Sequence, residues 1–264
     1  VQAGGLSTMA KNNVNIYSVK GDIIKSVELP AAFAAEFRPD IIHRAAVAEQ
    51  ANRRQPYGPS PTAGVRHAVS QWGKGRGTAR VQRLTQGSKA AESPNNVGGR
   101  RAFPPKPEKD YSKKVNRKEK FKAKLSALAA LSDLEMVKKR GHQFDDGLTM
   151  PVIVEDDFER LATTGDVVSA LENIGVSADL ERAKDGKKIR AGRGKMRGRK
   201  YKTPRSILVV VSAKEAPVFK GANNLPGVEI VSTEGLSAGV LAPGGMAGRL
   251  AVFSESALKK IGEW

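Results

Sequence analysis

Ile207-Leu208-Val209-Val210-Val211 is the stretch of sequence that decides the fold. Five consecutive aliphatic residues, most of them β-branched, are typical of a strand that is covered on both faces, as in a parallel sheet. Val152-Ile153-Val154 is a second run of this kind, and residues 228–231 and 250–253 are expected to form two more strands. The sequence therefore predicts a mostly parallel sheet.

Helical segments alternate with these strands. We expect helices over residues 156–161, 166–173 and 216–224, and Ser254 is expected to cap a C-terminal helix that ends near Ile261. Residues 176–180 are predicted to form a further strand. The alternation of strands and helices predicts an α/β fold with a three-layer α/β/α body.

The N-terminal part of the chain adds a hairpin and a helix. Residues 14–19 and 23–29 have an extended, alternating pattern on either side of the turn signal Lys20-Gly21-Asp22, which predicts a β-hairpin. Apolar residues recur at helical spacing over residues 40–55, so a helix is expected there.

A second helix is expected after a long irregular segment. Asn116 and Glu119 form a capping-box pattern, and the helix that they open is expected to run to the stop at Arg140-Gly141. Residues 53–118 show neither helical nor alternating periodicity. Ordinary loops in compact domains have about 4–6 residues, so a loop of this length is either disordered or functional.

The sequence is accordingly divided into three parts. Residues 1–12 are expected to be a disordered leader. Residues 13–52 and 119–264 are expected to form one globular α/β domain. Residues 53–118 are expected to form an extended basic loop.

Positive charge is concentrated in two segments. Residues 53–118 contain 16 Lys and Arg against three acidic residues, a net charge of +13. Residues 182–205 contain 12 against one, a net charge of +11. The whole chain carries +18, so the other 174 residues carry −6. A pI near 10.1 indicates a polyanionic partner, and nucleic acid is favoured over membrane because the basic segments have no amphipathic apolar stripe.

Several classes of function find no support in the sequence. There is no cysteine, which excludes disulfides, thiolate nucleophiles and cysteine metal sites. Residues 192–200 lack the Gly-Lys-Ser/Thr ending of a nucleotide-binding loop, and residues 73–77 do not complete a dinucleotide fingerprint. His43, His67 and His142 are far apart in the sequence, so packing or surface roles are favoured over metal binding.

One acidic group could suggest an enzyme. Glu155-Asp156-Asp157 follows a predicted strand, where α/β enzymes often place carboxylates. The same acids suit the first turn of a helix, where the helix dipole favours negative charge, and we prefer this interpretation. We therefore predict that the chain is not an enzyme and has no cofactor and no metal site.

RNA is the expected partner of the basic segments. Glycine lets the backbone approach a ligand closely, and interleaved Arg and Lys neutralise phosphates. A folded RNA offers crevices for an irregular loop, whereas readers of duplex DNA usually present a helix or a β-ribbon. Trp72 either stacks on a base or anchors the loop's own fold, and the sequence leaves both open.

The candidate RNA-binding residues share a place in one of the two basic segments. They are Arg53, Arg54, Arg66, Trp72, Lys74, Arg76, Arg80, Arg83, Lys89, Arg100, Arg101, Lys106, Lys187, Lys188, Arg190, Arg193, Lys195, Arg197, Arg199 and Lys200.

Several motifs resemble those of one known family. They are Gly73-Lys74-Gly75-Arg76-Gly77-Thr78-Ala79-Arg80, His142-Gln143-Phe144, Pro151-Val152-Ile153-Val154, Gly192-Arg193-Gly194-Lys195-Met196-Arg197-Gly198-Arg199, Leu241-Ala242-Pro243-Gly244-Gly245 and Gly248-Arg249-Leu250. Together they resemble large-subunit ribosomal protein four, the universal L-four family, in its archaeal and eukaryotic form. The resemblance covers nearly everything from about Asn13 to the end, and the absence of a long lysine-rich extension makes the chain look archaeal.

The resemblance implies a structural, non-catalytic protein of the large ribosomal subunit in the cytoplasm. In this family a globular α/β domain lies on the outside of the large subunit, and a long basic loop, here residues 53–118, penetrates the ribosomal RNA and lines the constriction of the peptide exit tunnel. The protein thereby binds large-subunit ribosomal RNA and supports its assembly. The expected partners are this RNA, neighbouring ribosomal proteins including the L-twenty-two family, and the nascent peptide by proximity. The tunnel-proximal tip corresponds to Gln71, Trp72, Gly73, Lys74, Gly75, Arg76 and Gly77.

Two other functions remain open at the level of sequence. One is an RNA-modifying or nucleotide-using α/β enzyme with a basic docking loop, which the missing phosphate motif and catalytic groups disfavour. The other is a regulatory RNA-binding protein that acts off the ribosome.

Overall fold

The computed structural model describes residues 13–264, so the leader predicted for residues 1–12 lies outside the described residues. The chain forms two compact units. One, called the body here, comprises the residues up to Gln50 together with Lys114–Trp264. The other, called the loop unit, is Ala51–Lys113. The domain limits predicted at residues 53 and 118 stay a prediction.

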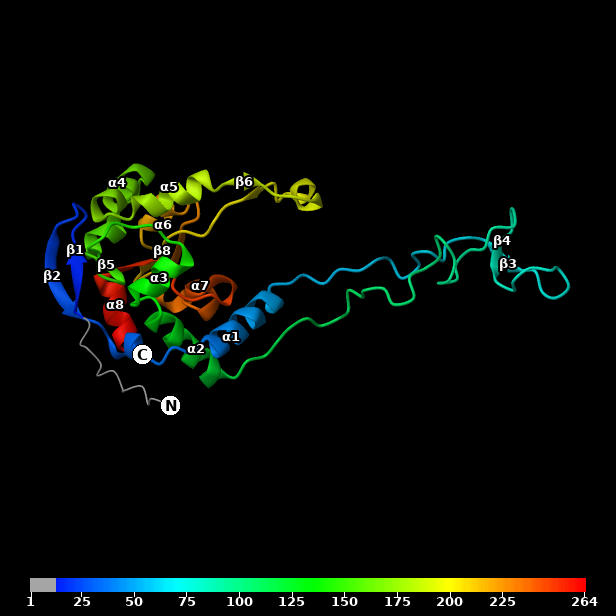
Figure 1. The fold of residues 1–264 in the computed structure, drawn as a ribbon, viewed down its shortest axis with the longest axis horizontal. Helices are drawn as coiled ribbons and strands as arrows, with labels where there is room; N and C mark the ends of the chain where they lie inside the picture. The colour runs from blue at the N-terminus through cyan, green and yellow to red at the C-terminus, as the bar shows by residue number, and fades with distance from the viewer. Residues whose placement is uncertain (1–12) are drawn as a thin grey trace, which may run out of the picture. The chain divides into compact units, whose positions relative to one another are not determined.

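The body is built on a six-stranded sheet in the order β2-β1-β5-β10-β8-β9 (Figure 1). Only β1 and β2 are antiparallel, and the other four pairings are parallel. This confirms the predicted mostly parallel sheet and the predicted N-terminal hairpin. The strands are β1 Asn13–Tyr17, β2 Ile23–Glu28, β5 Val152–Val154, β8 Leu208–Val211, β9 Glu229–Ser232 and β10 Ala251–Ser254.

Helices and single turns connect and flank the strands. The α-helices are α1 Pro39–Asn52, α2 Arg117–Ala129, α3 Leu134–Arg140, α4 Thr164–Ile174, α5 Ser177–Asp185, α6 Val218–Ala222, α7 Ala238–Leu241 and α8 Glu255–Gly262. The 3-10 turns are η1 Ala31–Ala34, η2 Asp156–Arg160, η3 Arg193–Arg197, η4 Thr233–Gly235 and η5 Pro243–Gly245.

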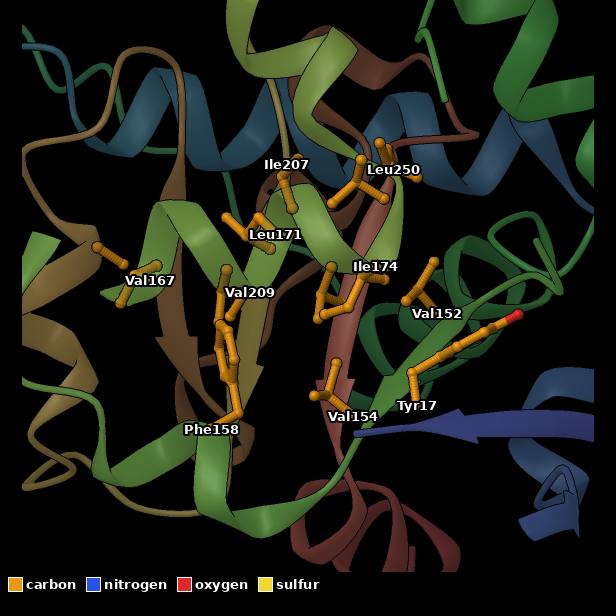
Figure 2. Packing of buried hydrophobic residues seen from close by; sticks show 14 of the residues in the cluster. Tyr17, Val152, Val154, Phe158, Val167, Leu171, Ile174, Ile207, Val209 and Leu250 are labelled. Atoms are coloured by element: carbon orange, nitrogen blue, oxygen red, sulfur yellow. The ribbon is translucent and has the colours of Figure 1, made fainter. Parts of the chain in front are cut away.

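Strand β8 shows why the chain forms three layers. It lies between β10 and β9, and all four of its side chains are buried. Val209 and Val211 pack in one cluster with residues of α3, α4, α5 and α6, among them Leu171 and Ile174 (Figure 2). Leu208 and Val210 pack in a second cluster with α1, α2, α7 and α8. Because successive side chains of a strand point to opposite faces, a continuous apolar run requires helices on both sides. The predicted α/β/α body is confirmed.

Two local predictions were wrong in the segment after the loop. The helix expected from Asn116 to Arg140 is divided into α2 and α3, because Asp133 starts a new helix by accepting hydrogen bonds from the backbone N–H groups of Glu135 and Met136. The Asn116 side chain makes no capping hydrogen bond. The predicted stop at Gly141 is confirmed, since this residue adopts φ 93°.

The strand predicted over residues 176–180 is also wrong, since α5 begins at Ser177. The buried apolar residues are Val176, Leu180 and Ala183, whose spacing of four and three residues is helical rather than alternating. Because the predicted strand ended at residue 180, it left out Ala183, the position that makes the helical spacing visible. The cap at Ser254 is confirmed, because its side chain accepts a hydrogen bond from the Ala257 N–H.

Replacing Phe253 by alanine should lower the free energy of unfolding of the body by about 3–5 kcal/mol. The ring is fully buried on β10 and meets Phe33 edge-to-face at 5.7 Å, so its loss leaves a cavity in the second cluster. Phe37→Ala is the matched control, because the Phe37 side chain is 39% exposed. Chemical denaturation followed by circular dichroism measures both, and equal losses would contradict the assignment of Phe253 to the core.

Candidate nucleic-acid interface

The loop unit contains a short hairpin at the predicted tip. β3 Val69–Gln71 pairs antiparallel with β4 Gln82–Leu84, and the residues between them form the turn. Gly73, Gly75 and Gly77 all have positive φ, between 63° and 82°, which side chains with a Cβ rarely adopt. A Cβ at any of the three would meet no other atom within 4 Å. The alternating glycines therefore serve the path of the backbone and leave its surface open.

Trp72 is held by cations of the same hairpin. The Arg76 guanidinium lies 5.3 Å and the Arg83 guanidinium 5.1 Å from the centre of the indole ring, within the range of a cation–π contact. The Trp72 side chain is half-buried. These contacts support a role of Trp72 in anchoring the hairpin, and its stacking on a base stays a prediction.

Some of the predicted RNA-binding arginines are engaged within the loop unit. Arg83 donates hydrogen bonds to the carbonyl oxygens of Ser88 at 2.6 Å and Ala79 at 3.3 Å. Arg66 donates to the hydroxyls of Thr62 and Ser60. The Arg54 guanidinium lies 4.2 Å from the centre of the Tyr111 ring.

The other predicted cations of the loop unit leave their hydrogen-bonding groups free in the described chain, although Arg76 also lies against the Trp72 ring. Each is exposed, and in the described chain none of their side chains makes a hydrogen bond or an ion pair. They are Arg53, Lys74, Arg76, Arg80, Lys89, Arg100, Arg101 and Lys106.

The second basic segment is a hairpin of the body, called the basic hairpin here. β6 Lys188–Ile189 pairs with β7 Tyr201–Lys202, and η3 forms its end, seen in yellow standing away from the sheet in Figure 1. Arg190 fixes it internally, because its backbone N–H donates to the Lys200 carbonyl at 2.8 Å and its Nε donates to the Arg199 carbonyl at 3.1 Å.

The remaining predicted RNA-binding cations of the basic hairpin are exposed. Two of them, Lys187 and Lys200, place their ammonium groups 4.9 and 5.4 Å from the centre of the Tyr201 ring. The others are Lys188, Arg193, Lys195, Arg197 and Arg199.

A buried carboxylate holds both ends of the basic hairpin. Asp179 of α5 is fully buried and accepts a hydrogen bond from Arg182 Nε at 2.8 Å and one from Ser206 Oγ at 2.6 Å. Arg182 in turn donates through Nη2 to the Arg205 carbonyl at 2.8 Å. Residues 182 and 205–206 are where the basic segment leaves and rejoins the fold, so one side chain fixes both.

Two further donors complete the shell of this carboxylate. His142 Nδ1 lies 3.1 Å from each Asp179 carboxylate oxygen, and the Gln143 backbone N–H donates to Oδ1 at 3.1 Å. Burial alone would raise the pKa of Asp179, but the hydrogen bonds from His142, Arg182 and Ser206 outweigh it and hold the pKa far below its ordinary value.

Sequence reasoning missed Asp179 altogether. The residue lay in a segment interpreted as a strand, and apart from Arg182, three residues on, its side-chain partners come from residues 27 and 37 positions away in the chain. The available signals were an acidic residue among small and apolar ones and an arginine at helical spacing from it, because charged side chains are almost never fully buried unless they are paired.

Asp179→Asn should destabilise the body by about 3–5 kcal/mol, the usual cost of removing one partner from a buried pair. Because the folded pKa is depressed, the carboxylate contributes its stability above its ordinary value of 3.8, and this contribution is lost as the pH falls below it. The difference between wild type and variant should therefore be largest near neutral pH and should shrink in acid.

Denaturant titrations at pH 7 and at several values below pH 4 measure this difference. Asp185→Asn is the matched control, since it removes the same charge from an exposed position of the same helix. A difference that stayed constant from neutral pH into acid would contradict the role assigned to the carboxylate.

The side chains considered above as catalytic or metal-binding candidates are held by contacts within the body. His142 is buried against Asp179. In the acidic group, Glu155 accepts a hydrogen bond from the Val19 N–H and Asp156 accepts one from the Ser256 N–H. Between Asn13 and the C-terminus, no group of three or more potential ligands is arranged to hold a metal ion. In the same range, no helix is both long and apolar enough to cross a membrane.

Comparisons with known proteins agree with this geometry. The family model described as the ribosomal protein L4/L1 family matches residues 27–264. Three proteins named large ribosomal subunit protein uL4 are similar over 94% of this chain: one from Archaeoglobus fulgidus is 49% identical with 98% of its own length covered, one from Methanocaldococcus jannaschii is 51% identical with 97% covered, and one from Haloquadratum walsbyi is 48% identical with 98% covered.

Proposed function

This chain belongs to the ribosomal protein L4/L1 family, and from this premise we propose that its two basic segments bind large-subunit ribosomal RNA. As a member of this family the chain is a structural constituent of the large ribosomal subunit, and it is not an enzyme. Its location is the ribosome of the cytoplasm.

The observation that supports the proposal is that exposed cations without an ion pair are concentrated in the loop unit and the basic hairpin. Eight of the predicted cations of the loop unit make no hydrogen bond or ion pair among the described residues, and the basic hairpin presents further exposed Lys and Arg side chains. The ion pairs of the body involve mostly other residues, such as Lys25 with Glu255 and Arg249 with Glu229. Free cations gathered on irregular segments are suited to phosphates, because each phosphate that they neutralise releases condensed counterions.

The glycines of the loop unit allow its backbone to lie close to RNA. Gly73, Gly75 and Gly77 have no Cβ, so RNA backbone can approach the tip closely. Lys74 and Arg76 alternate with these glycines and can contact phosphates on either side of the hairpin. The same two segments would bring separate parts of the RNA together, which is how the protein would support assembly of the subunit.

We further propose that the tip, residues 71–77, lines the constriction of the peptide exit tunnel. The tip contains three glycines and two cations, and its one large apolar side chain, Trp72, is half-buried beneath Arg76 and Arg83, so little apolar surface is left that could retain a passing polypeptide. In this arrangement the nascent peptide passes the tip, and a protein of the L-twenty-two family lies opposite it. Neighbouring ribosomal proteins and ribosomal RNA are the partners of the remaining surface.

Fractionation of a native lysate on a density gradient tests the ribosomal role directly. We expect one copy of the protein in each large subunit, retained through a high-salt wash and released by ribonuclease. Protein that remained in the soluble fractions would contradict the proposal and would favour RNA regulation away from the ribosome.

Replacing Arg76 and Arg80 together by glutamine should weaken binding to protein-free large-subunit RNA and reduce its salt dependence. Each lost phosphate contact lowers the slope of log K against log salt by about 0.7–0.9. Filter binding at several salt concentrations measures the slope, and circular dichroism checks that the body stays folded.

Lys20→Gln with Lys220→Gln is the matched control, since both side chains are exposed cations of the body outside the basic segments. The proposal expects the control pair to change the slope by less than the loop pair. Equal changes would mean that net charge alone, and not the loop, governs binding.

A further inference from the structure

Two aromatic rings of the loop unit have no aromatic or cationic partner between residue 13 and the C-terminus. Of its four aromatic residues, Trp72 and Tyr111 each have two cationic side chains close to the ring. Phe103 is 92% exposed and Tyr57 is 69% exposed. In the described part of the chain, neither ring makes an aromatic or a cation–π contact. The other two aromatic rings of the loop unit are covered by cationic side chains, whereas these two are exposed to solvent. Exposed aromatic surface of this kind indicates a binding site.

Tyr57 and Phe103 open onto two hollows of about 830 and 970 Å³. Both hollows are lined by Tyr57, Arg100, Arg101, Pro104 and Pro105, and Phe103 lines the larger one. Their volumes lie within the range of about 300–1,000 Å³ that is typical of small-molecule sites. An aromatic wall and two adjacent guanidinium groups therefore share one concave surface.

The backbone around these hollows is closely packed. A Cβ at Gly58 would lie 2.3 Å from the Pro105 carbonyl oxygen, and one at Gly64 would lie 2.7 Å from the Arg100 Cα. Glycine thus allows two segments more than thirty residues apart to touch, and the prolines fix their own φ angles. The rings and guanidinium groups are consequently presented by a preorganised surface.

We propose that this surface is a pocket for an unstacked nucleobase, with Tyr57 and Phe103 stacking on the base and Arg100 and Arg101 binding the adjoining phosphates. The inference rests on the proposed RNA-binding function and deepens it. Bases splayed out of single-stranded RNA characteristically stack on aromatic side chains, and arginine binds phosphate through two parallel hydrogen bonds.

The charges of the pocket orient the nucleotide. Arg100 and Arg101 are exposed, and their side chains form no ion pair or hydrogen bond among the described residues. Glu108 also lines both hollows, and its carboxylate repels phosphate while it accepts hydrogen bonds from N–H groups. The phosphates therefore lie toward the arginines, and a base edge that carries an amino or imino group lies toward Glu108.

The test compares full-length variants for binding to protein-free large-subunit RNA over a range of salt concentrations. Phe103→Ala should weaken binding by about 5- to 150-fold, the effect of losing one base stack, with no change in the salt slope because no charge is removed. Phe103→Tyr should restore the affinity. Arg100→Gln should instead lower the slope by about 0.7–0.9.

Val97→Ala is the matched control, since Val97 is 91% exposed in the same unit and lines neither hollow. Ultraviolet crosslinking followed by mass spectrometry should place a nucleotide on Phe103 or Tyr57 in the wild-type complex.

Two outcomes separate the failure of this inference from failure of the function on which it rests. Wild-type protein that binds the RNA while Phe103→Ala binds as well as Val97→Ala would overturn the base pocket and leave RNA binding intact, as expected if a protein partner covers these rings. Wild-type protein that does not bind the RNA would overturn both.

Discussion

The buried carboxylate of Asp179 is the constraint on which the arrangement of the body depends. It joins α5, the segment before β8 and the segment after α3 through four donors: the side chains of His142, Arg182 and Ser206 and the backbone of Gln143. An unpaired carboxylate in this position would be very costly, because burial disfavours its charged form. The hydrogen bonds offset that cost only if all of these elements are in place together.

The same contacts continue into a network of alternating charge. The Ser206 carbonyl accepts from the fully buried Arg249, and Arg249 pairs with Glu229 at 2.8 Å. Glu229 also accepts from Arg205, the residue whose carbonyl is bound by Arg182. The network therefore links the residues at the base of the basic hairpin to the sheet. Its negative members are Asp179 and Glu229, and each accepts hydrogen bonds from at least two side chains.

How much could be predicted from the sequence depended on how local each signal was. β8 could be predicted because burial on both faces leaves a continuous apolar run, and the start of α8 because Ser254 caps it within three residues. α5 was not predicted, because its buried face includes a charged residue, Asp179, two of whose side-chain partners, His142 and Ser206, lie far away in the chain. The division of the predicted helix into α2 and α3 occurs because Asp133 caps a new helix. Apolar periodicity alone does not reveal such a cap.

In the candidate interface, too, the local signals were visible in the sequence and the contacts between side chains and backbone were not. Composition and charge were enough to identify the two basic segments, but they gave every cation in them equal standing. The structure separates cations that fold the segments, such as Arg83 and Arg190, from exposed ones such as Arg80 and Lys195. That separation rests on hydrogen bonds from guanidinium groups to backbone carbonyls, which have no sequence signature.

Arginine is suited to this double use. A guanidinium has five donors in a fixed plane. It can therefore satisfy two backbone carbonyls that no helix or strand pairs, as Arg83 of β4 does for Ser88 and Ala79. It keeps its positive charge while doing so, and it therefore adds to the potential that attracts RNA. A segment rich in glycine and poor in apolar residues cannot be held by a core of its own. Using part of its charge to satisfy its backbone and presenting the rest to the partner lets one composition serve both the local fold and the interface.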